Sequence, residues 1–487
     1  MPNNNNIGWN FDETYTNLPS MFYSTAKPDP ATNPTIVFFN DSLAKELGLD
    51  ANVLQADDGV NTLAGNSLPN NSMPIAQAYA GHQFGNFTML GDGRAIMLGE
   101  QLTPDEKRYD IQFKGSGRTA YSRGGDGFAA IGPMLREYIM SEAMHGLNIP
   151  TTRSLAVIKS DDPVYRDDVL SRGILTRVAK SHLRVGTFQY ALAYGDVADV
   201  QALADYAINR HYPDFKNTST QYADFLRKVV KQQAYLVAKW QLVGFIHGVM
   251  NTDNMTISGE TIDYGPCAFM NSFAPNTVFS SIDHQGRYAY GNQPAIANWN
   301  VARFAETLLP LLDSDQDKAV EIAKEIISSF QMYFSNAWLA GMRSKLGLFT
   351  TKETDNDLIS ELVRAMEKYQ ADYNDTFLAL TRDTLEGEVL FQSEEFNTWY
   401  QRWQTRLQEE NKSSDEVVRL MRSSNPALIP RNHLVERALT DAVEHDNYDF
   451  MNYLLSALKN PFAHSQAQAE FEKIPVPQTP YQTYCGT

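Results

Sequence analysis

The sequence predicts an α+β protein built from two lobes, a strand-rich small lobe followed by a large, mostly helical C-terminal lobe. Between about residues 76 and 190, short stretches of alternating polar and apolar residues are separated by glycine turns, a pattern typical of β-strands. After about residue 200, nearly every long segment has the apolar periodicity of an amphipathic helix. The third observation is a polar motif at residues 247–254, near the start of the helical part.

The N-terminal segment and the small lobe are predicted in order along the chain. Residues 1–75 are rich in Asn, Pro, Ser and Thr, so we expect an irregular extension with one helix at 41–47. The small lobe, residues 76–190, contains a glycine-rich loop at 115–127. Its expected elements are a hairpin of 88–90 and 95–100 around the turn 91–93, a strand at 109–114, a helix at 133–146, and strands at 154–158 and 173–179.

Residues 191–487 form the expected helical lobe. Within it, the segment 247–267 is expected to be an irregular metal-binding and catalytic loop. After Lys473, three prolines within six residues predict an extended tail. The clearest helical patterns cover 222–246, 301–312, 317–346 and 355–373.

Composition narrows the class of protein and its partners. The chain has 487 residues and a formal net charge of −17, which argues against nucleic acid or an anionic membrane as a partner. No apolar run is long enough to span a bilayer, and the N-terminus lacks the order of a signal peptide. We therefore expect a cytoplasmic protein, and a monomer. Residues 107–184 nevertheless hold thirteen Lys and Arg against eight Asp and Glu. This local excess suits a polyanion such as a triphosphate, and a solvated basic face explains the charge equally well.

The motif at 247–254 resembles a protein kinase catalytic loop with one part missing. Kinase loops read H-x-D-x-x-x-x-N, in which the Asp orients the acceptor hydroxyl and the Asn binds magnesium. Counted from His247, Asn254 occupies the position of the metal-binding Asn, and Asp263 begins an Asp-Tyr-Gly that matches the second metal ligand. Val249 occupies the position of the base, and its side chain cannot accept a proton. The two lobes and this motif together predict a protein-kinase-like fold.

The nucleotide site of such a fold needs a glycine turn near the phosphates and a lysine held by a glutamate. The turn 91–94, Gly-Asp-Gly-Arg, can supply the first. Lys114, at the end of a strand, and Glu137, in the next helix, can supply the second. Magnesium prefers hard oxygen ligands, which Asn254 and Asp263 offer.

Several arginines make this site differ from that of a kinase. Arg177 and Arg184 lie around the last strand of the small lobe, and Arg118 and Arg123 lie in the glycine-rich loop. Because a guanidinium binds phosphate oxygens in a bidentate manner, these residues could draw a triphosphate inward by its γ end. The α-phosphate would then face the acceptor; ordinary surface salt bridges are the alternative interpretation.

Taken together, the motifs resemble the selenoprotein O (SelO/YdiU) family of protein adenylyltransferase pseudokinases. The resemblance runs from about residue 80 to the C-terminus. It rests on Ala-Gly-His-Gln-Phe-Gly at 80–85, Leu-Gly-Asp-Gly-Arg at 90–94, Phe-Lys-Gly-Ser-Gly-Arg-Thr at 113–119, Tyr-Ser-Arg at 121–123, Leu-Arg-Glu at 135–137, the motif 247–255, Asp-Tyr-Gly-Pro at 263–266 and the Cys485 tail.

The resemblance implies transfer of AMP from ATP, and in some members UMP from UTP, to Ser, Thr or Tyr hydroxyls of protein substrates. Asp253 would be the proton acceptor, Glu137 would support Lys114 as an ion pair, and Asn254 and Asp263 would bind Mg²⁺ or Mn²⁺. From the residues alone, Asp253 could equally be a metal ligand. The implied nucleotide-binding residues are Gly91, Gly93, Arg94, Lys114, Asp126, Gly127, Arg177, Arg184 and Asp263.

Two alternatives and one redox hypothesis remain open at this point. The chain could be an atypical kinase-like phosphotransferase, or a non-catalytic pseudokinase scaffold that only binds nucleotide. Cys267 and Cys485 could form a regulatory disulfide that tethers the tail across the active-site loop. The alternative is that they are two unrelated thiols in a reducing compartment.

Overall fold

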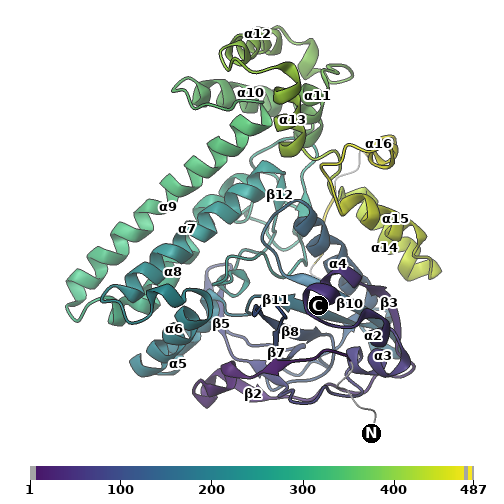
Figure 1. The fold of residues 1–487 in the computed structure, drawn as a ribbon, viewed down its shortest axis with the longest axis vertical. Helices are drawn as coiled ribbons and strands as arrows, with labels where there is room; N and C mark the ends of the chain where they lie inside the picture. The colour runs from purple at the N-terminus through teal and green to yellow at the C-terminus, as the bar shows by residue number, and fades with distance from the viewer. Residues whose placement is uncertain (1–6, 477–480, 485–487) are drawn as a thin grey trace.

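The computed structural model describes residues 7–476 and 481–484, and its centre is a nine-stranded antiparallel sheet (Figure 1). Two strands lie beside the main path of this sheet, β1 (Phe11–Asp12) next to β7 and β9 (Ala129–Ala130) next to β11. The others follow the order β2 (Tyr23–Thr25), β4 (Ile75–Gln77), β7 (Ala95–Leu102), β8 (Arg108–Lys114), β11 (Val169–Ala179), β10 (Arg153–Tyr165) and β3 (Thr35–Phe39).

The two faces of the sheet have different chemistry because side chains alternate along each strand. On β8, Ile111 and Phe113 are fully buried in an apolar core that includes the N-terminal helices. Asp110, Gln112 and Lys114 point to the opposite face and are also buried. The strand that we predicted at 109–114 is thus confirmed, and its polar face pairs with charged side chains such as Glu137 and Arg210.

Three of the nine strands come from residues 1–75, for which the sequence predicted an irregular extension. The same segment forms α1 (Asp41–Glu46), α2 (Ala51–Leu54) and α3 (Asp57–Leu63), which cover one face of the sheet. Helix α1 matches the helix predicted at 41–47, and the Asn40 side chain caps it by accepting a hydrogen bond from Leu43 N–H.

The predicted hairpin of 88–90 and 95–100 is wrong. β6 (Asn86–Met89) pairs with β5 (Ala80–Gln83), whereas β7 pairs with β8. The turn of the actual hairpin is Phe84-Gly85, and both residues have positive φ, as a two-residue type I′ turn requires. The segment 91–93 does not form a hairpin turn. Instead, it lies beside the end of β4, where Asp92 N–H donates a hydrogen bond to the Gln77 carbonyl at 2.9 Å.

The second half of the described chain is helical, as predicted. Helix α4 (Ile131–Gly146) packs on the sheet, while α7 (Gln221–Leu242), α8 (Gln293–Leu312) and α9 (Gln316–Lys345) lie side by side beyond it (Figure 1). The remaining long helices are α5 (Val185–Tyr194), α6 (Val197–His211), α10 (Asp355–Tyr369), α11 (Tyr373–Arg382), α12 (Glu394–Gln408), α13 (Ser414–Ser424), α14 (Asn432–His445), α15 (Asp449–Leu458) and α16 (Gln466–Glu472).

Three helix boundaries differ from the predictions. Helix α8 begins at Gln293, eight residues before the predicted start at 301. Helix α7 ends at Leu242, since Gly244 has a φ of 72° and the chain continues as β12 (Phe245–Ile246), paired with β13 (Ala268–Phe269). The pattern 355–373 is divided by Gln370, whose φ of 52° ends α10 before α11 begins.

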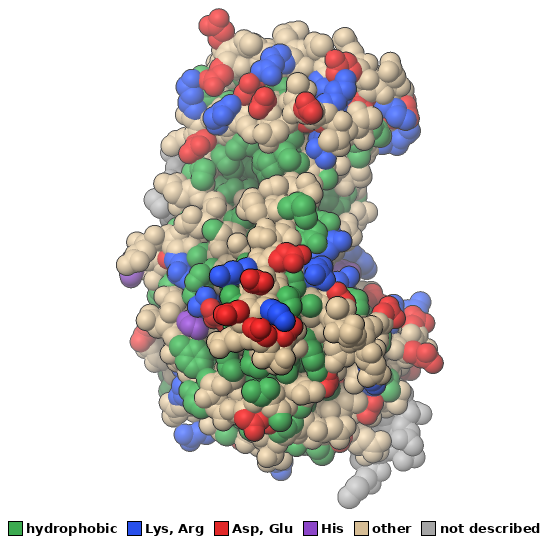
Figure 2. All heavy atoms as spheres, turned by 90° about the vertical axis from the view of Figure 1, so that its left-hand side faces the viewer, with side chains coloured by type: hydrophobic (Ala, Val, Ile, Leu, Met, Phe, Trp, Pro, Cys, Tyr) green, Lys and Arg blue, Asp and Glu red, His purple; other side chains and the backbone are tan. Residues whose placement is uncertain are grey.

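Among residues 7–476 and 481–484, no helix is both long and apolar enough to cross a bilayer. On the face drawn in Figure 2, Lys and Arg side chains are interspersed with Asp and Glu, and an apolar band separates two charged groups.

Candidate active site

A cavity of about 400 Å³ lies between the polar face of the sheet, the glycine-rich loop and the loops around residues 249–266. The cavity wall is formed by residues that are far apart in the sequence, and it includes all the nucleotide-binding, catalytic and metal-binding residues that the family resemblance implies. These are Gly91, Gly93, Arg94, Lys114, Asp126, Gly127, Arg177, Arg184, Asp253, Asn254 and Asp263.

The glycine turn and the glycine-rich loop form one wall by packing on each other. Gly91 has a φ of 112°, and a Cβ there would lie 2.4 Å from the ring of Tyr121. Thr119 Oγ1 donates a hydrogen bond to the Asp92 carbonyl at 2.6 Å. At the rim, Asp126 forms an ion pair with Arg166 at 2.9 Å. Glycine at position 91 therefore allows the segment 91–93 to pack closely against the glycine-rich loop.

Glu137 lies behind the cavity wall and holds two cations in place. Its carboxylate accepts hydrogen bonds from Lys114 Nζ and from Arg177 Nε, both at 2.7 Å. Burial would raise the pKa of Glu137, but Arg177 and Lys114 outweigh it and keep the pKa below its ordinary value. Glu137 is thus ionised, and it orients both cations toward the cavity.

Asp263 faces the same cations from the other side. Its Oδ1 lies 2.8 Å from Lys114 Nζ and 2.6 Å from Arg177 Nη2, and its Oδ2 lies 3.3 Å from Arg184 Nη1. Burial alone would raise the pKa of Asp263, but Arg177, Lys114 and Arg184 together hold it well below its usual range. The residue has a left-handed φ of 62°, a conformation that Asp tolerates better than most residues.

Arg184 and Asp253 meet at the deep end of the cavity. Arg184 Nη1 donates to the Asp253 carbonyl at 2.9 Å, and the guanidinium stacks 4.4 Å above the ring of Tyr79. Burial raises the pKa of Asp253 to about 6, against the opposing effect of Arg184. Among the described residues, Arg184 Nε and Asp253 Oδ1 are buried polar atoms with no hydrogen-bond partner.

The residues present fit a divalent cation. Asn254 Nδ2 donates to the Val249 carbonyl at 3.0 Å, which leaves its Oδ1 as the free acceptor. With the Asp263 carboxylate, this gives two hard oxygen donors on one cavity, a number that suits Mg²⁺ completed by phosphate and water. No group of three or more His, Cys, Asp or Glu side chains with metal-binding geometry occurs within the described residues.

The structure also shows where the other residues singled out from the sequence lie. His247 is buried, and its Nε2 lies 2.9 Å from the Ile262 carbonyl, so it joins the two loops that carry Asn254 and Asp263. Arg123 lines the cavity rim, whereas Arg118 is exposed and does not belong to the wall. Cys267 is buried, and burial raises the pKa of its thiol to about 12. Cys485 lies outside the described residues.

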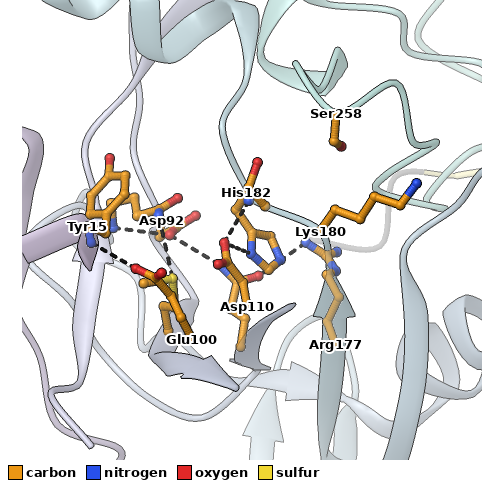
Figure 3. A network of polar contacts seen from close by, with 12 residues as sticks. Tyr15, Asp92, Glu100, Asp110, Arg177, Lys180, His182 and Ser258 are labelled. Atoms are coloured by element: carbon orange, nitrogen blue, oxygen red, sulfur yellow. Dashed lines mark hydrogen bonds and ion pairs between the residues drawn. The ribbon is translucent and has the colours of Figure 1, made fainter. Parts of the chain in front are cut away.

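Asp92 is a site residue that the sequence did not reveal. It is buried beside the glycine turn, accepts hydrogen bonds from Gln77 N–H at 3.1 Å and Gln112 Nε2 at 3.2 Å, and lies 3.7 Å from Arg184. Figure 3 shows that Asp92, Asp110 and Arg177 belong to one polar network, with Tyr15 and Glu100 at one end. An acid between two turn glycines gave no signal for a buried structural role.

A phosphate-binding set of buried cations next to hard oxygen ligands is the arrangement used by nucleotide-dependent transferases. A family profile described as "Protein adenylyltransferase SelO" matches residues 6–459, and the chain belongs to this family.

Curated relatives are similar to this chain over nearly its whole length, and three of them are named "Protein nucleotidyltransferase YdiU". The protein from Bacillus mycoides is 56% identical over 100% of both chains. Those from Bacillus cytotoxicus and Halalkalibacterium halodurans are each 58% identical over 99% of this chain and 98% of their own. The chain is therefore an enzyme of the nucleotidyltransferase class.

Proposed function

We propose that this enzyme transfers AMP from ATP to Ser, Thr or Tyr hydroxyls of protein substrates in the cytoplasm, as a monomer with a protein-kinase-like fold. Mg²⁺ or Mn²⁺ would be held by Asn254 and Asp263. The observation that carries the proposal is the combination at one cavity of Lys114–Glu137, the pair Asn254 and Asp263, and the apolar Val249 where a kinase has its base. UTP would serve as an alternative co-substrate.

The depth of the arginines supports a nucleotide that enters with its phosphates first. The side chains of Arg177 and Arg184 are only 2% and 3% exposed at the inner end of the cavity, while Asp126 lies at the rim beside exposed glycines. A triphosphate has its greatest charge at the γ end, so the buried guanidiniums favour that end. The base and ribose would then lie toward the rim near Gly127.

The chemistry that follows is a displacement at the α-phosphorus. The acceptor oxygen forms a bond to phosphorus, the bond to the bridging oxygen of the β-phosphate breaks, and pyrophosphate leaves. The acceptor proton passes to Asp253, whose Oδ1 has no partner in the described structure and whose pKa is raised to about 6. A bound divalent cation would neutralise charge that develops on the phosphate oxygens.

Label transfer tests the proposal and separates it from its rivals. The enzyme is incubated with a protein mixture and with ATP labelled at either the α- or the γ-phosphate, in Mg²⁺ and in Mn²⁺, with Asp263→Ala as the inactive control. Protein labelled from the α-phosphate only, and not by the variant, is the expected result. Label from the γ-phosphate only would identify a phosphotransferase instead. ATP binding without any transfer would favour a scaffold.

A further inference from the structure

Three side chains from distant parts of the sequence form a closed hydrogen-bonded ring next to Asp253. Thr252 Oγ1 accepts from His82 N–H at 2.7 Å and donates to Gln189 Oε1 at 2.6 Å. Gln189 Nε2 lies 2.8 Å from His82 Nδ1 and closes the ring. Thr252 is fully buried and Gln189 is 6% exposed, so these two members of the ring are shielded from water.

The donor and acceptor roles in this ring follow from its one backbone member. The His82 N–H can only donate, so Thr252 Oγ1 accepts it and uses its own hydrogen toward Gln189 Oε1. The Gln189 amide is thereby oriented, and its Nε2 donates to His82 Nδ1. Burial lowers the pKa of His82, which is consistent with a neutral ring whose Nδ1 accepts. With the Gln189 amide in this orientation, every donor in the ring meets an acceptor.

The same three segments approach Asp253 so closely that side chains are excluded. A Cβ on Gly81 would lie 2.8 Å from Asp253 Oδ1. A Cβ on Gly186, in α5, would lie 2.1 Å from the Ala80 carbonyl and 3.2 Å from Asp253 Cα. The residue before Thr252 adds to this contact: Asn251 Oδ1 accepts hydrogen bonds from Phe84 N–H at 3.1 Å and from Tyr288 OH at 2.5 Å. Strand β5, helix α5 and the loop 251–254 thus form one rigid contact.

We infer that His82, Gln189 and Thr252 are positioning residues for AMP transfer, because their ring fixes the backbone that carries Asp253 toward the acceptor hydroxyl. The inference rests on the proposed function for its chemistry. None of the three is among the residues proposed to bind phosphate or metal, and none of them lines the cavity. Their loss should therefore lower kcat and leave the KM for ATP unchanged.

Thr252→Val tests the inference with almost no change of shape. It removes the hydroxyl and leaves His82 N–H and Gln189 Oε1 without a partner. Since a displacement of about 1 Å at a reacting group can lower a rate ~100-fold, we expect kcat to fall about 10- to 100-fold, with the KM for ATP within about twofold. Thr252→Ser, which keeps the hydroxyl, should restore most of kcat. Thr88 lies on the hairpin that carries His82 but is not part of the ring, so Thr88→Val should behave as wild type.

Two further measurements keep the test decisive. His82→Leu breaks the ring from its half-exposed member, so it serves if Thr252→Val does not fold. Hydrogen exchange of the amides of residues 251–254 needs no activity, and it should rise in Thr252→Val but not in Thr252→Ser. Wild-type kcat and unchanged exchange in both ring variants would overturn the inference. So would a parallel loss of kcat and ATP affinity that Thr252→Ser does not reverse. Absence of transfer by the wild-type enzyme would instead contradict the proposed function, and the exchange result would still decide the ring.

Discussion

Asp263→Asn should strengthen the binding of metal-free ATP while it removes the benefit of the metal. In the structure, the Asp263 carboxylate neutralises Lys114, Arg177 and Arg184 at 2.8, 2.6 and 3.3 Å. The same carboxylate repels a triphosphate that approaches these cations. Asparagine keeps the size and one oxygen acceptor but removes the charge, so the electrostatic consequences can be separated from steric ones.

The size of the effect follows from the charges. Two unit charges about 6 Å apart, at an effective dielectric constant of ~20, interact by ~3 kcal/mol, and salt reduces this to roughly half. A gain of ~1.4 kcal/mol corresponds to about tenfold tighter binding of metal-free ATP. Without a ligand, the variant should be less stable than wild type by ~3 kcal/mol, because three buried cations lose a partner that is 24% exposed.

Calorimetric titration with ATP, in EDTA and then in Mg²⁺, measures both effects. We expect Asp263→Asn to bind ATP more tightly than wild type in EDTA and to gain little from Mg²⁺, whereas wild type should gain strongly. Asp357→Asn, an exposed residue of α10, is the matched control and should change neither titration. Equal or weaker binding of metal-free ATP by a folded Asp263→Asn variant would refute the electrostatic argument.

Three other substitutions have defined outcomes. Burial raises the pKa of Glu260 from 4.5 to about 7, so the folded state keeps a proton that the unfolded chain releases. Stability is therefore lost as pH rises from about 4.5 to 7. Glu260→Gln should raise the free energy of unfolding by up to ~3 kcal/mol at pH 8, measured as a higher Tm, and should leave it unchanged at pH 4. Burial lowers the pKa of Lys345 from 10.5 to about 7, and its Nζ has no hydrogen-bond partner in the described structure. The unfolded chain binds a proton there between pH 7 and 10.5 that the folded state releases, so stability rises with pH over this range. Lys345→Met should stabilise by up to ~4 kcal/mol at pH 6, and thermal melts in which the gain persists at pH 11 would contradict this reason. Gly91→Ala should weaken ATP binding by about tenfold, because its Cβ would meet Tyr121 at 2.4 Å. Tyr121→Ala should restore part of that loss, and strict additivity of the two changes would show that the contact is irrelevant.

Local patterns predicted the elements, whereas the pairing of strands depends on contacts that the local sequence does not contain. The alternation at 109–114 predicted β8 because each side chain there has one of two different environments. The hairpin around Gly91 was predicted wrongly because a Gly-x-Gly motif reads as a reversal. Here glycine is required instead by the contact of Gly91 with Tyr121, about thirty residues later in the chain.

The residues of the candidate site could likewise be predicted where they form a local pattern, and not where they come together only in the fold. Asn254 and Asp263 could be found because they lie close together in one short segment, and both line the same cavity. Lys114 and Glu137 could be found because a strand and the next helix carry them in order. The ring of His82, Gln189 and Thr252 has no such spacing, since its members lie on a hairpin, a helix and a loop. Asp92 was missed for a related reason: its buried partners, Gln77 and Gln112, lie on other strands.

The structure also explains why a valine is tolerated where a kinase needs an acid. Val249 is 7% exposed, and its carbonyl accepts the hydrogen bond that orients Asn254, so the backbone at this position would still serve the proposed metal site. The side chain is then free to be apolar, provided that an acid is held elsewhere. Asp253 meets that condition, since Arg184 binds its carbonyl, Gly81 and Gly186 allow β5 and α5 to approach it, and Thr252 anchors the preceding peptide. In the proposed mechanism, Asp253 would take the part that an acid at position 249 plays in a kinase. Transfer of the α-phosphoryl group, with the γ end of ATP at the buried arginines, is the chemistry that we propose for this arrangement.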